Sequence, residues 1–115
     1  ISMNNVMYQT KLLNKELKRS NEYNQYVRVL GNLRAHPDLY ARTLEFQRRS
    51  IHLQSGADYN TLEEVGRLRK EFEDILNQPV VIDFLGAEQR VVNMLKRTQE
   101  GILEGIELET AALDE

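Results

Sequence analysis

Apolar side chains recur at three- and four-residue steps along most of the chain, a spacing that predicts amphipathic helices. Helices are predicted over about 3–19, 22–35, 37–53, 61–76 and 79–108. The predicted fold class is therefore all-α, with about five helices in an elongated antiparallel bundle that ends in a long helix. A single domain is expected over residues 3–108, followed by an acidic, frayed tail over 109–115.

The helix boundaries carry recognisable signals. Ser20 and its neighbour Asn21 are good N-caps, so one helix ends there and the next begins. Pro37 and Pro79 fit the first turn of a new helix. Thr61 and Glu64 have the capping-box spacing, and residues 55–58 form the clearest loop.

The apolar positions of each stretch are the expected core. They include Tyr26, Val27 and Leu30, then Leu44, Phe46 and Ile51, then Leu62, Leu68, Phe72 and Ile75, and finally Ile82, Leu85 and Val92.

The last helix is too long for its own subunit to cover. Thirty residues span roughly 45 Å, whereas a compact domain of ~100 residues has a diameter near 35 Å. Ile102, Leu103 and Ile106 would then stay in water in a monomer. We therefore expect a second copy of the chain to cover this helix, with an interaction surface at Val91, Leu95, Ile102 and Ile106.

The composition excludes several classes of site. The 115 residues contain no cysteine and two histidines, which excludes disulfides, thiol nucleophiles and cysteine-bound metals. His36 and His52 are sixteen residues apart, not the four that would place both on one helical face, and Glu-x-x-His does not occur. We expect no catalytic residue, cofactor, metal or membrane span, and a cytoplasmic location.

Charge is distributed unevenly along the chain. Residues 1–56 hold nine Lys/Arg against four Asp/Glu, while residues 57–115 hold six against fourteen. Basic helices packed beside acidic ones explain this most simply. The alternative is a nucleic-acid surface at Arg42, Arg48 and Arg49 together with the lysines of the first helix.

Glu88 lies close to the apolar stripe of the last helix, one turn from Leu85 and Val92. A buried carboxylate needs a partner. We expect a structural polar contact to an arginine or tyrosine of another helix, the alternative being a carboxylate exposed at the edge of the stripe.

Four segments resemble the YlbF/YmcA/YheA family of bacterial helical proteins. They are LKRSNEY (residues 17–23), His36-Pro37, the Phe46, Ile51 and Leu53 pattern, and FLGAEQR (residues 84–90). The resemblance implies a helical bundle with a long final helix, seen as dimers or higher oligomers. Relatives are regulatory subunits in Gram-positive bacteria, and two of them join a complex that affects development and messenger RNA processing.

The complex of those relatives carries iron–sulfur clusters through cysteines, which this chain lacks, so cluster binding is not carried over. The chain is closest to the cysteine-free YheA-type branch. Taken together, the sequence predicts a non-enzymatic regulatory or adaptor protein that works by protein–protein contact. Its expected partners are a second copy of itself and, beyond that, another regulatory protein.

Overall fold

The computed structural model describes residues 2–56 and 61–109, with side chains from residue 4 onward. The described residues are helical without strands, which confirms the all-α fold. The helices are α1 (Ser2–Lys18), α2 (Asn21–Arg34), α3 (Pro37–Ser55), α4 (Thr61–Glu71), α5 (Glu73–Leu76) and α6 (Pro79–Leu103). Part of the predicted loop, 57–58, and most of the predicted tail, 110–115, lie outside the described residues.

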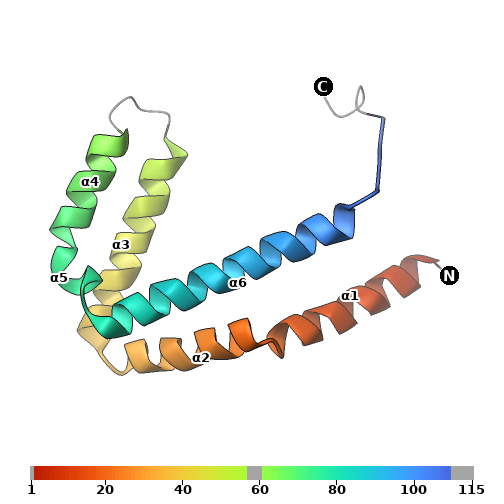
Figure 1. Cartoon of the computed structure of the whole chain (residues 1–115), viewed down its shortest axis with the longest axis horizontal. Coiled ribbons are helices and arrows are strands. Elements are labelled where there is room, and N and C mark those ends of the chain that lie inside the picture. Colours follow the sequence, from red (N-terminus) through yellow and green to blue (C-terminus); the bar gives the residue numbers. More distant parts are fainter. Residues whose placement is uncertain (1, 57–60, 110–115) are drawn as a thin grey trace.

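The helices form two arms that meet at an angle (Figure 1). The long arm consists of α1 and α2, which follow one another, with α6 antiparallel to α2. The short arm is the antiparallel pair of α3 with α4 and α5. The chain is long and thin as a result, with extents of 54 × 38 × 17 Å.

Three of the predicted boundary signals, at Ser20, Pro37 and Pro79, act where the sequence places them. Ser20 Oγ accepts a hydrogen bond from the backbone N–H of Tyr23 at 3.1 Å and so caps α2. Pro37 begins α3 and Pro79 begins α6. In both cases the proline occupies a position whose N–H would have no partner within the helix.

Two predicted helices end differently from expectation. The predicted 61–76 helix is interrupted at Phe72, whose ring packs on Phe46 with centroids 5.6 Å apart, and a short α5 follows. The last helix ends at Leu103, five residues before the predicted end. Gly105 has φ +79°, a left-handed conformation that glycine adopts without strain and that commonly ends a helix.

Each arm has its own core. Between α2 and α6 the buried side chains are Val29, Leu33, Val81, Phe84 and Ala87. In the short arm they are Phe46, Leu68, Phe72 and Ile75.

Several positions predicted for the core are exposed instead: Val27 (50%), Leu44 (38%), Ile51 (67%), Leu62 (89%), Ile82 (53%) and Val92 (37%). These predictions were wrong because the apolar stripe of each helix is about a third of its circumference wide. A single neighbouring helix covers only the residues at the centre of that stripe, and the residues at its edges stay exposed. On α6 the covered positions are Val81, Phe84 and Ala87, and Ile82 lies between the first two.

Candidate interaction surface

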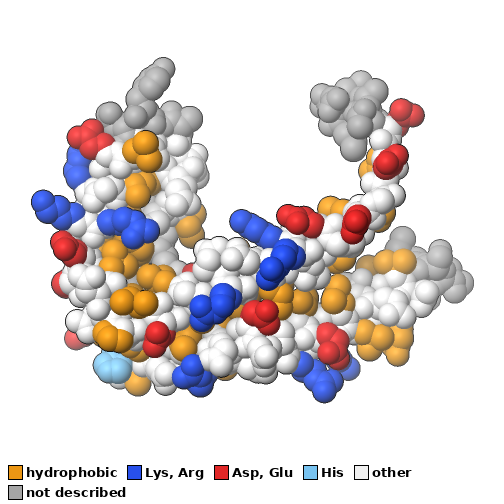
Figure 2. Space-filling model, in the orientation of Figure 1, with side chains coloured by type: hydrophobic (Ala, Val, Ile, Leu, Met, Phe, Trp, Pro, Cys, Tyr) orange, Lys and Arg blue, Asp and Glu red, His pale blue; other side chains and the backbone are white. Residues whose placement is uncertain are grey.

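The free end of the long arm carries apolar side chains that its own chain leaves uncovered. No described side chain of α1 is buried, and none on α6 is buried after Ala87. We give the name distal surface to six apolar residues of this end: Val6, Leu13 and Leu17 on α1 and Val91, Leu95 and Ile102 on α6. Of these, Leu13, Leu17 and Val91 are half-buried and the other three are exposed. In Figure 2 hydrophobic side chains are visible around the end of α1, and acidic side chains gather on the end of α6.

A shallow groove of about 240 Å³ separates the two helices of the distal surface. Leu13 and Leu17 line one wall, and Leu95 and Ile102 line the other. Because α1 and α6 approach without closing over these side chains, this part of the chain contains no core of its own among the described residues.

The four residues predicted as an interaction surface fall in three settings. Val91 is half-buried, whereas Leu95 and Ile102 are 45% and 55% exposed on α6. Ile106 is 62% exposed but lies beyond the helix, after the turn at Gly105. The structure therefore leaves three of the four accessible to a partner.

Glu88 lies where the two arms meet. Its Oε1 accepts a hydrogen bond from Nε2 of Gln47 on α3, at 2.5 Å. The partner is thus an amide of another helix, in place of the arginine or tyrosine expected. Burial raises the pKa of the nearby Tyr26 hydroxyl above its ordinary value, and the negative charge of Glu88 raises it further.

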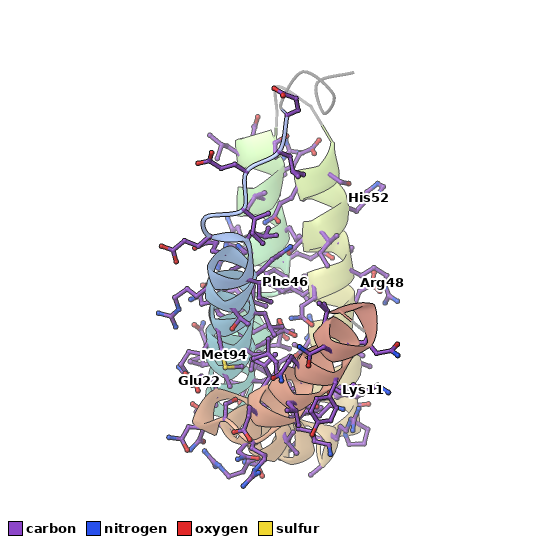
Figure 3. The ribbon with its side chains drawn as sticks, turned by 90° about the vertical axis from the view of Figure 1, so that its right-hand side faces the viewer. Lys11, Glu22, Phe46, Arg48, His52 and Met94 are labelled. Carbon is purple, nitrogen blue, oxygen red and sulfur yellow. The ribbon has the colours of Figure 1, made fainter. Side chains whose placement is uncertain are left out.

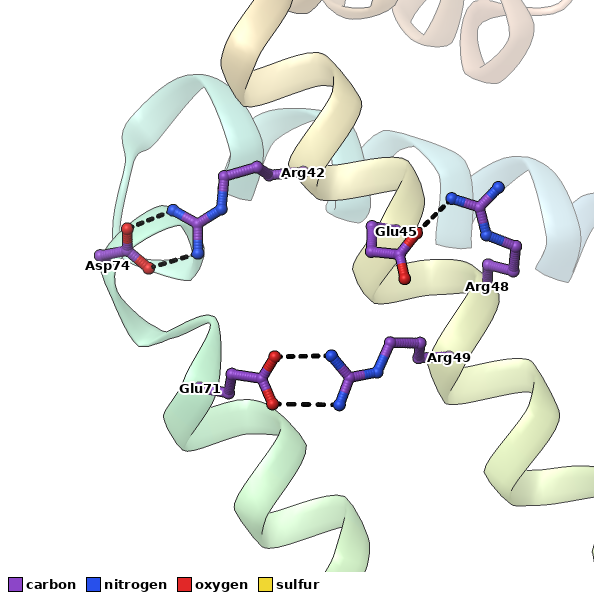
Figure 4. Close-up of polar contacts among 6 residues, drawn as sticks. All are labelled: Arg42, Glu45, Arg48, Arg49, Glu71 and Asp74. Atoms are coloured by element: carbon purple, nitrogen blue, oxygen red, sulfur yellow. Dashed lines mark hydrogen bonds and ion pairs between the residues drawn. The ribbon is translucent and has the colours of Figure 1, made fainter.

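The arginines proposed for nucleic-acid contact are all paired with carboxylates (Figure 4). Arg49 forms two hydrogen bonds to Glu71, of 2.6 and 3.0 Å. Arg42 pairs with Asp74 in the same two-pronged way, and Arg48 pairs with Glu45 one turn earlier on α3. In the single chain, each of these guanidinium groups is therefore directed at a carboxylate of the same chain.

Two of these arginines also hold the short arm together. Arg42 and Arg49 both reach from α3 to the α4–α5 segment, where their guanidinium carbons lie 5.3 and 5.5 Å from the centre of the Phe72 ring. Hydrogen bonds from Arg49 hold the pKa of Glu71 below its ordinary value, and those from Arg42 do the same for Asp74. Figure 3 shows Arg48 and His52 projecting outward from α3, apart from the buried Phe46.

The chain matches a known protein family over residues 6–107, under the description "Control of competence regulator ComK, YlbF/YmcA". The chain belongs to the Com_YlbF family. The match spans the whole distal surface, both arms and the corner between them. Membership of Com_YlbF links the chain to control of the competence regulator ComK, which is consistent with a regulatory protein. The assignment to a YheA-type branch stays a prediction.

Searches among curated proteins and among solved structures each found no match. Within residues 2–56 and 61–109, no three His, Asp or Glu side chains gather in a way that could hold a metal ion. No helix in this part of the Com_YlbF chain has the length and apolar character to cross a membrane.

One feature of the site was not predicted from the sequence. A groove of about 360 Å³ lies in the inner angle between the arms, where Phe46 and Ile51 of α3 face Leu85 and Glu88 of α6. It brings together residues more than thirty positions apart in the chain. No local sequence signal indicates this groove, because its lining comes from separate helices whose packing the sequence pattern does not specify.

Proposed function

We propose that this Com_YlbF protein is a non-enzymatic, cytoplasmic regulatory adaptor that works by protein–protein contact and self-associates through the distal surface. Its setting would be bacterial developmental or RNA-processing regulation, in keeping with the link of the family to ComK control. Homo-oligomer formation would supply the missing cover for α1 and the end of α6. Another regulatory protein would then bind the assembled oligomer.

The observation that carries this proposal is the amount of surface that the single chain leaves exposed. Its accessible surface is 9,335 Å². A compact monomer of 13.4 kDa would expose about 6,500 Å². The radius of gyration is 18.8 Å, against about 13 Å for a compact domain of this length.

The difference in surface, about 2,800 Å² for one chain, is at least as large as the surface that one copy buries in an obligate homodimer. Obligate homodimers bury roughly 2,000–5,000 Å² in total, or about 1,000–2,500 Å² per copy. The exposed apolar residues Leu95 and Ile102 have the character found at the centre of such interfaces. Self-association can therefore use residues that are already exposed on the single chain.

Sedimentation velocity of the purified chain at micromolar concentration tests the proposal. A species heavier than the single chain supports it, whereas a single species with the mass and elongated shape of one chain would refute it. Pull-down from the native host then identifies the second regulatory protein.

A further inference from the structure

The exposed face of α6 offers a contact for the second copy, and the charges beside this face set the orientation of that copy. Leu95, Gln99 and Ile102 lie three or four residues apart, so they share one face of the helix. They line the open groove beside α1, and all three stay exposed because α1 does not close over them. Resting on the self-association proposed above, we propose that two copies pair through α6 in antiparallel orientation. The two-fold axis would pass beside Gln99, with Leu95 of each copy packed on Ile102 of the other.

In an antiparallel pair, the spacing of the apolar residues sets the register. Leu95 and Ile102 are equally far from the midpoint between Thr98 and Gln99. In an antiparallel pair centred there, each leucine meets an isoleucine and the contact occurs twice. Such a contact is the same patch on both copies, so it closes into a dimer and does not extend into a chain.

The charges beside the apolar face decide between the two orientations. Lys96 and Glu100 lie one turn apart along the edge of this apolar face. They are centred on Thr98, half a residue from the centre of the Leu95 and Ile102 pair. Neither forms an ion pair with any residue that the structure describes. Antiparallel pairing places Lys96 of each copy opposite Glu100 of the other, whereas parallel pairing would place like charges together.

Because the chain has no cysteine, single introduced cysteines can report the register directly. A disulfide requires Cα atoms within about 7 Å. In the antiparallel pair, the two copies of position 95 are about 10 Å apart along the axis, seven residues at 1.5 Å each. Position 95 of one copy is instead next to position 102 of the other.

The experiment compares oxidation of Leu95→Cys, Ile102→Cys and Gln99→Cys, with one partner in each mixture carrying a mass tag. Mixing Leu95→Cys with Ile102→Cys should give the mixed disulfide about tenfold faster than either gives its own. Gln99→Cys, next to the axis, should link to itself. Ile82→Cys, on the same helix and equally exposed (53% against 55% for Ile102), is the matched control and should not link.

Three other outcomes overturn the proposal in distinguishable ways. If Leu95→Cys and Ile102→Cys each form a disulfide with a second copy of the same variant, and the mixed disulfide forms no faster, the two α6 helices are parallel. If light scattering gives the mass of a dimer but none of the cysteines at positions 95, 99 and 102 forms a disulfide between copies, then α6 is not the contact. Self-association itself would still hold. A single-chain mass with no cross-link would refute the antiparallel pair and the proposed function together. Circular dichroism of each variant checks that its helices are retained.

Discussion

Gln47 of α3 donates a hydrogen bond from Nε2 to Oε1 of Glu88 on α6, over 2.5 Å, and so joins the short arm to the long arm. Both side chains are half-buried, and they border the groove in the inner angle between the arms. The angle between the arms matters because it determines which surfaces of the chain a partner can reach. Removing the Gln47–Glu88 hydrogen bond therefore tests how much it contributes to holding the two arms together.

Removing this contact should destabilise the chain measurably. Glu88→Ala leaves the amide of Gln47 without its charged acceptor, so the free energy of unfolding should fall by about 1–2 kcal/mol. Urea unfolding followed by circular dichroism measures it. Gln89→Ala, which removes only an exposed hydrogen bond to Asn93, should change it by less than about 0.5 kcal/mol. Equal effects of the two variants would contradict a structural role for Glu88.

The stability of the short arm should depend on pH through Glu71 and Asp74. Their partners Arg49 and Arg42 lower both pKa values in the folded state. The ion pairs therefore contribute fully above the unfolded pKa values of about 4, and their contribution is lost as the pH falls through the folded values.

The double variant Glu71→Gln/Asp74→Asn should accordingly be less stable than the parent at neutral pH, and this difference should shrink as the pH falls through the acid range. Thermal unfolding across a pH series checks this. The control variant is Glu63→Gln/Glu73→Gln, which removes the same number of carboxylates from the same arm but leaves the pairs of Glu71 and Asp74 intact. Its thermal stability should depend on pH as steeply as that of the parent. A difference that persists undiminished at low pH would count against the assignment.

The nucleic-acid alternative makes its own prediction. Arg42, Arg48 and Arg49 are all paired with carboxylates, and we expect the exposed lysines of α1 to be too few for stable binding by themselves. Labelled single-stranded RNA should therefore show no retardation even at about 50 mM salt, where phosphate contacts are strongest. Binding that weakens steeply with added salt and is reduced by Arg48→Ala would restore that alternative.

The sequence predicts where helices begin more reliably than which face they bury. Ser20, Pro37 and Pro79 act locally, through the backbone geometry of one turn, so they could be recognised without a structure. The burial of Val81 in place of Ile82 depends on where α2 lies, which no local pattern specifies.

The contacts that cross between helices were beyond prediction for the same reason. Arg49 and Glu71 are 22 residues apart, and Gln47 and Glu88 are 41 apart. Their pairing follows from the packing of α3 against α4 and α6. The exposed end of α6 could be anticipated because helix length is a local property, and Ile102 remains 55% exposed even though the helix ends five residues early.

A single charge on the distal surface should weaken self-association. Ile102→Asp places an unpaired carboxylate in an apolar contact, so the dissociation constant should rise about tenfold or more. Sedimentation equilibrium measures it. Ile82→Asp, equally exposed near the start of the same helix, is the matched control and should leave the constant unchanged. If both variants weaken association equally, the contact is not at the distal surface.

The mass of the chain in solution tests the central claim most directly. Multi-angle light scattering at micromolar concentration should give about twice the 13.4 kDa of one chain, as expected if a second copy covers the distal surface. A mass of 13.4 kDa throughout the concentration range would contradict the account.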